Sequence, residues 1–526
     1  MIDQALRVRP PRPADHLQNE MWVDEQIWGH RLWDSQSPWL LFLEFLSVAE
    51  AKRRDGMLLD ERGQLYPLQF RPNKRMGLRN LLFNNESMSR TASRLADNNS
   101  AWSAWLHEMH ETAQGVSPPD FTYLRSHFPS FHQLELVLAL LRSSAVENES
   151  NRRWTSRFLF PFGPNALYED LTVKGSTQPS REYINFGRTG ELLYMMLCRA
   201  DCANELRPWL ERFLASDNPW NTLVGVLQPE GDQDRILREG SYLPYSRHSA
   251  FDRLGEDWLA VCRLELPGFD AYPHLVTLSA LHVALYQLAI AADQCATTRP
   301  HFRPHFICEL VAPRKTLVRE LSTMCYLDNA QLSQQAVESL ILGIAKSPEW
   351  LDAASQSNAF SLCKAILQDR VRWPRADHPE DYDGPEDPVR LLGDLRTNAS
   401  NRHRQHAGNI HLTYGGGAGL VSRRGTNRLR YAPNDGLIKA LVLANVGQRM
   451  EFGQFLATLF ERYRFVFGER EAERVLEKDD LDKRAFQANA ERLERRLATL
   501  GMLRRLSDAC AYVINPLWSV GQHDRG

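Results

Sequence analysis

The residues best suited to chemistry in this chain are arginines, which gather in its last quarter. Residues 395–434 hold seven arginines and neither Asp nor Glu. A guanidinium pairs with phosphate oxygens and bonds bidentately to guanine edges, so these side chains suit nucleic acid. We predict that nucleic acid is bound by residues of this segment and of the helix and hairpin that follow it: Arg402, Arg404, Arg423, Arg424, Arg428, Arg430, Lys483, Arg484, Arg492, Arg495, Arg496, Arg504 and Arg505.

The elements that would position these arginines form a pattern of helices followed by a hairpin. Helices are predicted from GLIKALVLANV, capped at Asn434 or Asp435, from MEFGQFLATLFERY and from LDKRAFQANAERLERRLATLG, which ends at Gly501. Leu503–Leu506 and Ala511–Ile514 predict a two-stranded hairpin. The order indicates a winged helix-turn-helix, in which the helix before the hairpin reads the major groove.

Two other interpretations of this tail stay open. Asp482, Glu491 and Glu494 interleave with the arginines, so a solvated helix face with i,i+4 ion pairs explains much of the charge. Many winged helices, moreover, bind only proteins. The glycine run at residues 414–419 can be a phosphate contact, a plain connector or a mononucleotide pocket, although its spacing matches neither phosphate-binding fingerprint.

The segments YAPNDGLIKALVLANV, MEFGQFLATLFERY and ERLERRLATLGMLRRLSDACAYVINP carry a resemblance to a known group of proteins. The tail, over residues 431–516, resembles the winged-helix ends of large prokaryotic proteins encoded beside helicases or ATPases in antiphage defence clusters. The resemblance includes no catalytic residue. It implies an accessory subunit with a helicase or ATPase as protein partner.

Catalytic and metal-binding signatures are weak elsewhere. His107, His110 and Glu111 share a helical face but are not HExxH, and Cys295, His301, His305 and Cys308 offer four tetrahedral ligands in a region that looks like a loop entering a strand. Surface or buried residues are the simpler interpretation of both sets. We find no GxSxG or P-loop, and therefore predict no catalytic residue, no metal and no cofactor.

A second basic tract, residues 71–94, precedes Trp102 and Trp105. Basic charge beside aromatic rings is typical of a groove that stacks bases, and an amphipathic helix face is the alternative. Four more tryptophans fall between residues 22 and 39. At that density they are expected to anchor a core or a partner surface.

The rest of the chain predicts a mainly α-helical, multidomain protein. Its 526 residues carry a net charge of −2, and short strands are expected at residues 64–70, 306–311 and 410–414. The predicted divisions are a Trp-rich helical region (1–130), a helical domain (131–372), an acidic Pro-rich linker (373–394) and the basic segment with the winged helix (395–526). Ala271–Ala292 is expected to be a buried core helix, because polar side chains interrupt its apolar run.

These features predict a nonenzymatic, DNA-associated accessory or scaffold subunit that binds mainly the phosphate backbone. Scattered cysteines and an N-terminus without an apolar stretch favour the cytoplasm, with no membrane partner. The alternatives are a protein–protein scaffold without DNA contact, and a hydrolase or nuclease whose site is assembled from distant residues.

Overall fold

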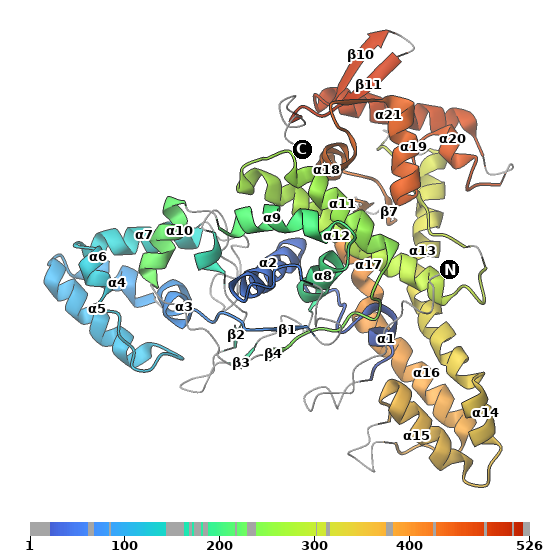
Figure 1. The fold of residues 1–526 in the computed structure, drawn as a ribbon, viewed down its shortest axis with the longest axis horizontal. Coiled ribbons are helices and arrows are strands. Elements are labelled where there is room, and N and C mark those ends of the chain that lie inside the picture. Colours follow the sequence, from blue (N-terminus) through green and yellow to red (C-terminus); the bar gives the residue numbers. More distant parts are fainter. Residues whose placement is uncertain are drawn as a thin grey trace.

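The computed structural model confirms a mainly helical protein with short strands (Figure 1). It describes residues 21–60, 68–83, 86–143, 163–167, 171–172, 180–181, 188–215, 218–228, 238–300, 302–311, 316–374, 382–423, 428–477, 481–507 and 510–518. Arg424 and His301, two of the residues singled out above, lie outside these ranges.

Helix α12 (Gly268–Gln294) is the centre of the main core. It contacts α1 (Asp24–Trp28), α2 (Pro38–Arg54), α11 (Ser249–Cys262) and, further along the chain, α13, α17 and α18. In the described part of the chain, α12 is the one helix long and apolar enough to span a membrane, and 83% of its most apolar window is buried inside the protein. It is thus a core helix, as its sequence predicted.

The polar side chains of α12 form specific bonds inside that core. Gln287 receives a hydrogen bond at its backbone oxygen from the Trp28 indole (2.9 Å), and its side-chain amide donates to the oxygen of Ala407. The Tyr286 hydroxyl donates to the oxygen of Trp28 at 2.9 Å. Helix α12 therefore holds both the N-terminal α1 and the segment before α17 against the main core.

A separate small core lies in the lobe at the left of Figure 1. Trp102 and Trp105, both fully buried, are at its centre and meet edge to face. The lobe is made of α3 (Met76–Phe83), α4 (Glu86–Arg94), α5 (Asn98–Thr112), α6 (Leu124–His127), α7 (Phe131–Ser143) and α10 (Pro219–Leu227). The division expected at residue 130 falls between α6 and α7, which share this core.

The remaining elements of the middle of the chain join the main core or pair locally. Helix α8 (Thr189–Cys198) packs on α2, and α9 (Ala203–Leu214) packs on α11. Two antiparallel strand pairs lie between these parts: β1 (Gln69–Phe70) with β4 (Arg238–Glu239), and β2 (Leu171–Thr172) with β3 (Ser180–Arg181).

An arm of long helices projects from α12 toward the lower right of Figure 1. It consists of α13 (Leu317–Ala345), α14 (Pro348–Ala354), α15 (Ala359–Val371) and α16 (Pro388–Gln405). Asp387 caps α16 by accepting from the Arg390 amide at 2.9 Å. Helix α16 thus begins inside the acidic segment expected to be a linker, whose residues 375–381 lie outside the described ranges.

The strand predicted at residues 410–414 is wrong, because this segment is the start of helix α17 (Ile410–Gly417). Ile410 and Tyr414 are both fully buried and lie one helical turn apart on the face that packs on α12, and this burial outweighs their strand propensity. A side chain at Gly417 would come within 2.4 Å of Pro38. The glycines therefore allow close packing of α17.

The tail begins after the antiparallel pair β6 (Val421–Ser422) and β7 (Arg430–Tyr431). Its elements are α18 (Asp435–Asn445), β8 (Arg449–Glu451), α19 (Phe452–Tyr463), β9 (Phe465–Val466), α20 (Glu469–Ala472), α21 (Lys483–Thr499), β10 (Leu503–Ser507) and β11 (Cys510–Ile514). Strands β10, β11 and β8 form an antiparallel sheet in that order, which confirms the predicted hairpin. Strand β9 pairs in parallel with β5 (Phe306–Ile307) of the body.

A buried carboxylate, Asp257 of α11, joins the tail to the body. It accepts hydrogen bonds from His282 (2.7 Å), from the Tyr463 hydroxyl (2.7 Å) and from Arg462 (2.5 Å). Arg462 also pairs with Glu256, whose side chain is half exposed. Since Arg462 and Tyr463 end α19, Asp257 fixes the position of β9 and of the elements that follow it.

We expect Asp257→Ala to destabilise the protein by about 3–5 kcal/mol, because the buried His282 and Tyr463 and the partly buried Arg462 lose their shared acceptor. Glu256→Ala is the matched control: it removes the neighbouring, half-exposed partner of Arg462 and should cost less than about 1 kcal/mol. Urea unfolding of both variants measures the difference. Equal stabilities of the two variants would contradict this role of Asp257.

The same carboxylate makes stability depend on pH. Burial alone would raise the pKa of Asp257, but the hydrogen bond and charge of His282 and the charge of Arg462 outweigh burial and hold the pKa below its usual 3.8. A lowered pKa contributes stability above pH 3.8 that is lost as the pH falls through the folded-state value. We expect Asp257→Asn to flatten the fall of the unfolding temperature in this acid range, while Glu256→Gln leaves it nearly unchanged.

Candidate nucleic-acid interface

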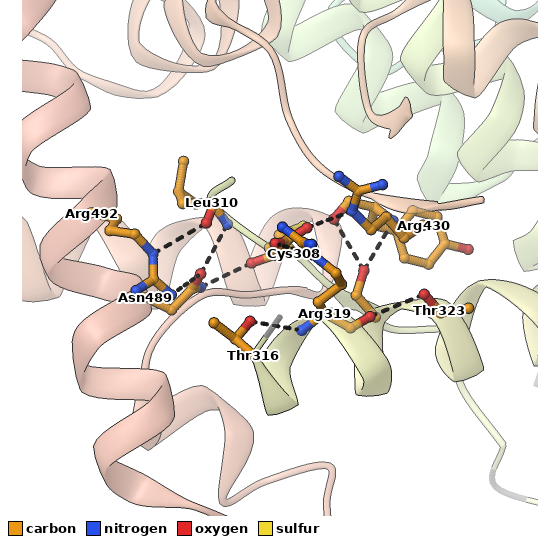
Figure 2. Close-up of polar contacts among 11 residues, drawn as sticks. Cys308, Leu310, Thr316, Arg319, Thr323, Arg430, Asn489 and Arg492 are labelled. Atoms are coloured by element: carbon orange, nitrogen blue, oxygen red, sulfur yellow. Dashed lines mark hydrogen bonds and ion pairs between the residues drawn. The ribbon is translucent and has the colours of Figure 1, made fainter. Parts of the chain in front are cut away.

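The helix predicted to read DNA, α21, is held on one side by the body of the protein (Figure 2). Asn489, fully buried, accepts from the Leu310 amide at 2.8 Å and donates to the oxygens of Cys308 (2.9 Å) and Phe467 (3.0 Å). Arg492 donates from Nε to the oxygen of Leu310 at 3.1 Å. The backbone of residues 308–310 thus holds α21 through the side chains of Asn489 and Arg492. Arg492 is therefore part of the attachment of α21 to the body.

Arg430, another residue predicted to contact nucleic acid, is bound within the same segment of the body, at Glu309. Its guanidinium is 2% exposed and bonds to Glu309, which is fully buried and also bonds to Arg319 at 2.8 Å. Figure 2 labels both arginines, Arg430 and Arg319, which pair with the carboxylate of Glu309. Because its guanidinium is buried and held by Glu309, Arg430 is not available to a phosphate in this structure.

Arg402 is likewise held by a carboxylate. It forms a bidentate pair with Glu25 of α1, whose side chain is 1% exposed, and it also donates to the oxygen of Met21. This pair ties α16 to the start of the described chain, 377 positions earlier. Arg402 therefore has a structural role here.

The outer face of α21 and the hairpin carry ion pairs on the surface. Lys483 pairs with Glu473, Arg495 with Glu491, Arg496 with Asp435, and Arg505 with Glu494. All four cations are more than half exposed. Such pairs contribute little to stability, so these cations can exchange a carboxylate for a phosphate at low cost.

The remaining predicted cations are exposed, and most have no partner in the described part of the chain. Arg484 lies at the start of α21 and Arg504 near the start of β10, so the helix and the hairpin each carry a guanidinium without a partner in the described residues. Arg423 directly follows β6, Arg428 comes shortly before β7, and both are exposed. Arg404 is exposed too and bonds to Asn401 on its own helix.

One further cation of this surface, Arg449, was not predicted from the sequence. Arg449 of β8 lies with its guanidinium 5.4 Å from the ring centre of Tyr512, which faces Arg504 across the hairpin. A single arginine between GQ and ME in the sequence gives no sign that it joins the hairpin. Only the pairing of β8 with β11 brings Arg449 and Arg504 to one sheet.

The metal-binding alternatives gain no support from the geometry. Among the described residues, no group of three His, Cys, Asp or Glu side chains is close enough to hold an ion. His107 is 77% exposed and contacts Glu111 at 3.5 Å, while Cys295 and Cys308 are buried. Burial raises the pKa of the Cys295 thiol to about 11, so it stays protonated at neutral pH.

The tryptophans predicted as possible stacking platforms are core residues instead. Trp102 and Trp105 are fully buried, and Trp22, Trp28 and Trp33 are at most 5% exposed. Trp33 stacks on His406, with 3.9 Å between ring centres. Burial confirms the expectation that Trp22, Trp28 and Trp33 anchor a core, and it leaves Trp102 and Trp105 unavailable to bases in this structure.

A basic cleft between α11 and α19 has no signature in the sequence. Its volume is about 610 Å³, and five arginines spread from residue 247 to residue 464 line it. We call it the α11–α19 cleft; its charged lining consists of Arg247, His248, Arg253, Asp293, Arg303, Glu461, Arg462 and Arg464. Residues so far apart in the chain share no local pattern.

Comparison with protein-family models, curated proteins and solved structures finds no match to this chain. The functional conclusion therefore depends on the charges, burial and contacts described above.

Arg430 and Arg428 are two positions apart but have opposite environments, which makes them a matched pair. We expect Arg430→Ala to destabilise the protein by about 3 kcal/mol, because it leaves buried Glu309 with one cation where it had two. Arg428→Ala, at an exposed site, should change stability by less than about 0.5 kcal/mol. Urea unfolding measures both; an Arg430→Ala protein as stable as wild type would refute the structural role of Arg430.

Proposed function

We propose that this chain is a nonenzymatic DNA-associated accessory subunit whose C-terminal tail is a winged helix. The order α18, β8, α19, α21, β10, β11 and the sheet order β10–β11–β8 support this assignment of the tail. In a winged helix the last helix and the hairpin after it face the nucleic acid. Here those elements are α21 and β10–β11.

The observation that carries the proposal is the placement of Arg484 and Arg504. Both are exposed, and neither forms an ion pair or a side-chain hydrogen bond within the described residues, whereas Lys483, Arg495, Arg496 and Arg505 around them are each paired with an acid. Guanidinium groups without a counter-ion on the protein are the natural partners of phosphate oxygens. Arg449 adds a third cation on the hairpin sheet.

Binding of this kind is weak and mostly independent of sequence. Residues 435–518 hold fourteen Lys and Arg against thirteen Asp and Glu, so the tail as a whole has almost no net charge to attract DNA. Asn489 and Arg492, the polar residues in the middle of α21, are bonded to the body. We therefore expect the contact to be with the phosphate backbone, through Arg484 on α21 and Arg504 on β10.

A partner protein completes the proposed role. The resemblance of the tail suggests a helicase or ATPase of a prokaryotic antiphage defence system, in the cytoplasm, which would supply the catalytic activity of the assembly. The chain would then act as a scaffold that places the partner on DNA.

A protein-docking function without DNA is the second candidate, and the hairpin itself favours it. Leu506 on β10 is 59% exposed and Leu517 just after β11 is 41% exposed. Exposed leucines beside arginines are typical of a protein interface, since an apolar side chain gains nothing from a phosphate. This candidate predicts no salt-dependent affinity for DNA.

The test is the affinity of the full chain for duplex DNA across a salt series. We expect Arg484→Ala with Arg504→Ala to flatten the slope of log affinity against log salt by about 0.9 for each phosphate that the variant no longer binds. The control is Arg212→Ala with Arg263→Ala, which removes the same charge from exposed sites on α9 and at the end of α11. Its slope should equal that of wild type.

Three outcomes decide between the two candidates. A flatter slope in the tail variant alone supports DNA binding by the winged helix. Equal slopes in the two double variants place any DNA contact elsewhere. No binding at low salt removes the DNA proposal and leaves protein docking.

A further inference from the structure

The α11–α19 cleft is lined by elements of both the body and the tail. Arg247 and Arg253 belong to α11 or to the segment just before it, Arg303 precedes β5, and Arg462 and Arg464 lie where α19 meets β9. The cleft carries five arginines and one histidine against the two acids Asp293 and Glu461. Its lining is thus strongly positive in a protein with a net charge of −2.

The acids near the cleft do not neutralise all of these arginines. Arg462 pairs with Asp257 and Glu256, Arg247 with Asp201, and Arg303 contacts Asp293 at 3.7 Å. Glu461 bonds to Arg474, which does not line the cleft. Within the described residues, the guanidinium groups of Arg253 and Arg464 form neither a hydrogen bond nor an ion pair.

Both of these unpaired arginines are partly buried, which is costly for a cation. Burial, together with the charge of Arg462, lowers the pKa of Arg253 more than the charges of Asp257, Asp252 and Glu256 raise it. Burial, together with the charge of Arg474, lowers the pKa of Arg464 more than the charge of Glu461 raises it. The Nε atom of Arg464 is buried without a partner, and its guanidinium lies 4.2 Å from the ring centre of Phe460. An anion in the cleft would offset both costs.

One wall of the cleft is apolar. Leu285, Ala289 and Ala292 lie on one side of α12, and Pro304 and Phe306 adjoin them. A cleft of about 610 Å³ is within the range of small-molecule sites, at roughly 300–1,000 Å³. Its ligand therefore needs an anionic group for the arginines and an organic part for the apolar wall.

We propose that the α11–α19 cleft binds a phosphorylated ligand of nucleotide size, with Arg253 and Arg464 holding its phosphate. Guanidinium groups suit this role because their planar donors match phosphate oxygens. Arg253 comes from the body and Arg464 from the tail, so the bound phosphate bridges the two. The phosphate can belong to a free nucleotide or to the 5′ end of a nucleic-acid strand.

The experiment measures binding to the full chain by calorimetry, with ATP, inorganic tripolyphosphate and a 5′-phosphorylated tetranucleotide as probes, each at about 1 mM, which detects even weak sites. Adenosine and the 5′-hydroxyl tetranucleotide are the uncharged and unphosphorylated controls. We expect at least one phosphorylated probe to bind and its control to bind at least tenfold more weakly. Preference for ATP indicates a free nucleotide, and preference for the tetranucleotide indicates a strand end.

Two variants tie this binding to the cleft. Arg464 has a φ of 62°, a conformation that Asn tolerates, so Arg464→Asn removes the guanidinium while keeping the backbone. Arg253→Met keeps the length of the side chain. Each should weaken binding at least tenfold, whereas Arg263→Ala, at the exposed end of α11, should not. Thermal unfolding without ligand checks that each variant is folded.

Absence of binding by all three phosphorylated probes would overturn the proposal, and so would binding that both cleft variants leave unchanged. The result is independent of the proposed DNA contact, because Arg484 and Arg504 do not line the cleft. A protein that binds ATP but not duplex DNA would keep this site and lose the winged-helix function.

Discussion

The contact on which the tail depends is the buried carboxylate of Asp257, which gathers His282 of the body with Arg462 and Tyr463 of the tail. A buried anion with three donors is stable only while all of them stay in place. Strand β9 follows these residues directly and pairs with β5. Residues 308–310, which come after β5, then bind the side chains of α21. The tail is therefore fixed to the body, and only its outer face and its hairpin are open to a partner.

This attachment decides which chemistry α21 can perform. Asn489, an amide in the middle of the helix and thus suited to reading adenine, is used to bind backbone groups of the body. The cations of α21 and the hairpin that stay accessible are unpaired in the described residues, like Arg484, or are paired with surface carboxylates that a phosphate can replace at low cost. Such a surface suits the proposed contact with a phosphate backbone better than it suits the reading of base edges. The same joint between α11 and α19 forms the basic cleft, so a small anion there would reinforce the attachment.

Local pattern predicted much of the fold and less of the site. Apolar periodicity and caps identified α12, α18, α19 and α21, and short apolar segments after Gly501 identified the hairpin. The strand expected at Ile410–Tyr414 was wrong because burial on α12 overrode strand propensity. No local signal separates buried Arg430 from exposed Arg428, since the partner Glu309 is 121 positions away. The cleft was equally hidden, because its arginines meet only when tail and body dock.

Hydrogen–deuterium exchange of the full chain, with and without duplex DNA at low salt, tests most directly whether the tail is the DNA-binding surface. We expect DNA to slow exchange in the first turn of α21 and in β8, β10 and β11, and to leave the helices of the lobe built around Trp102 unchanged. Slowed exchange in the lobe or the α13–α16 arm, with none in the hairpin, would contradict the assignment of DNA binding to the tail.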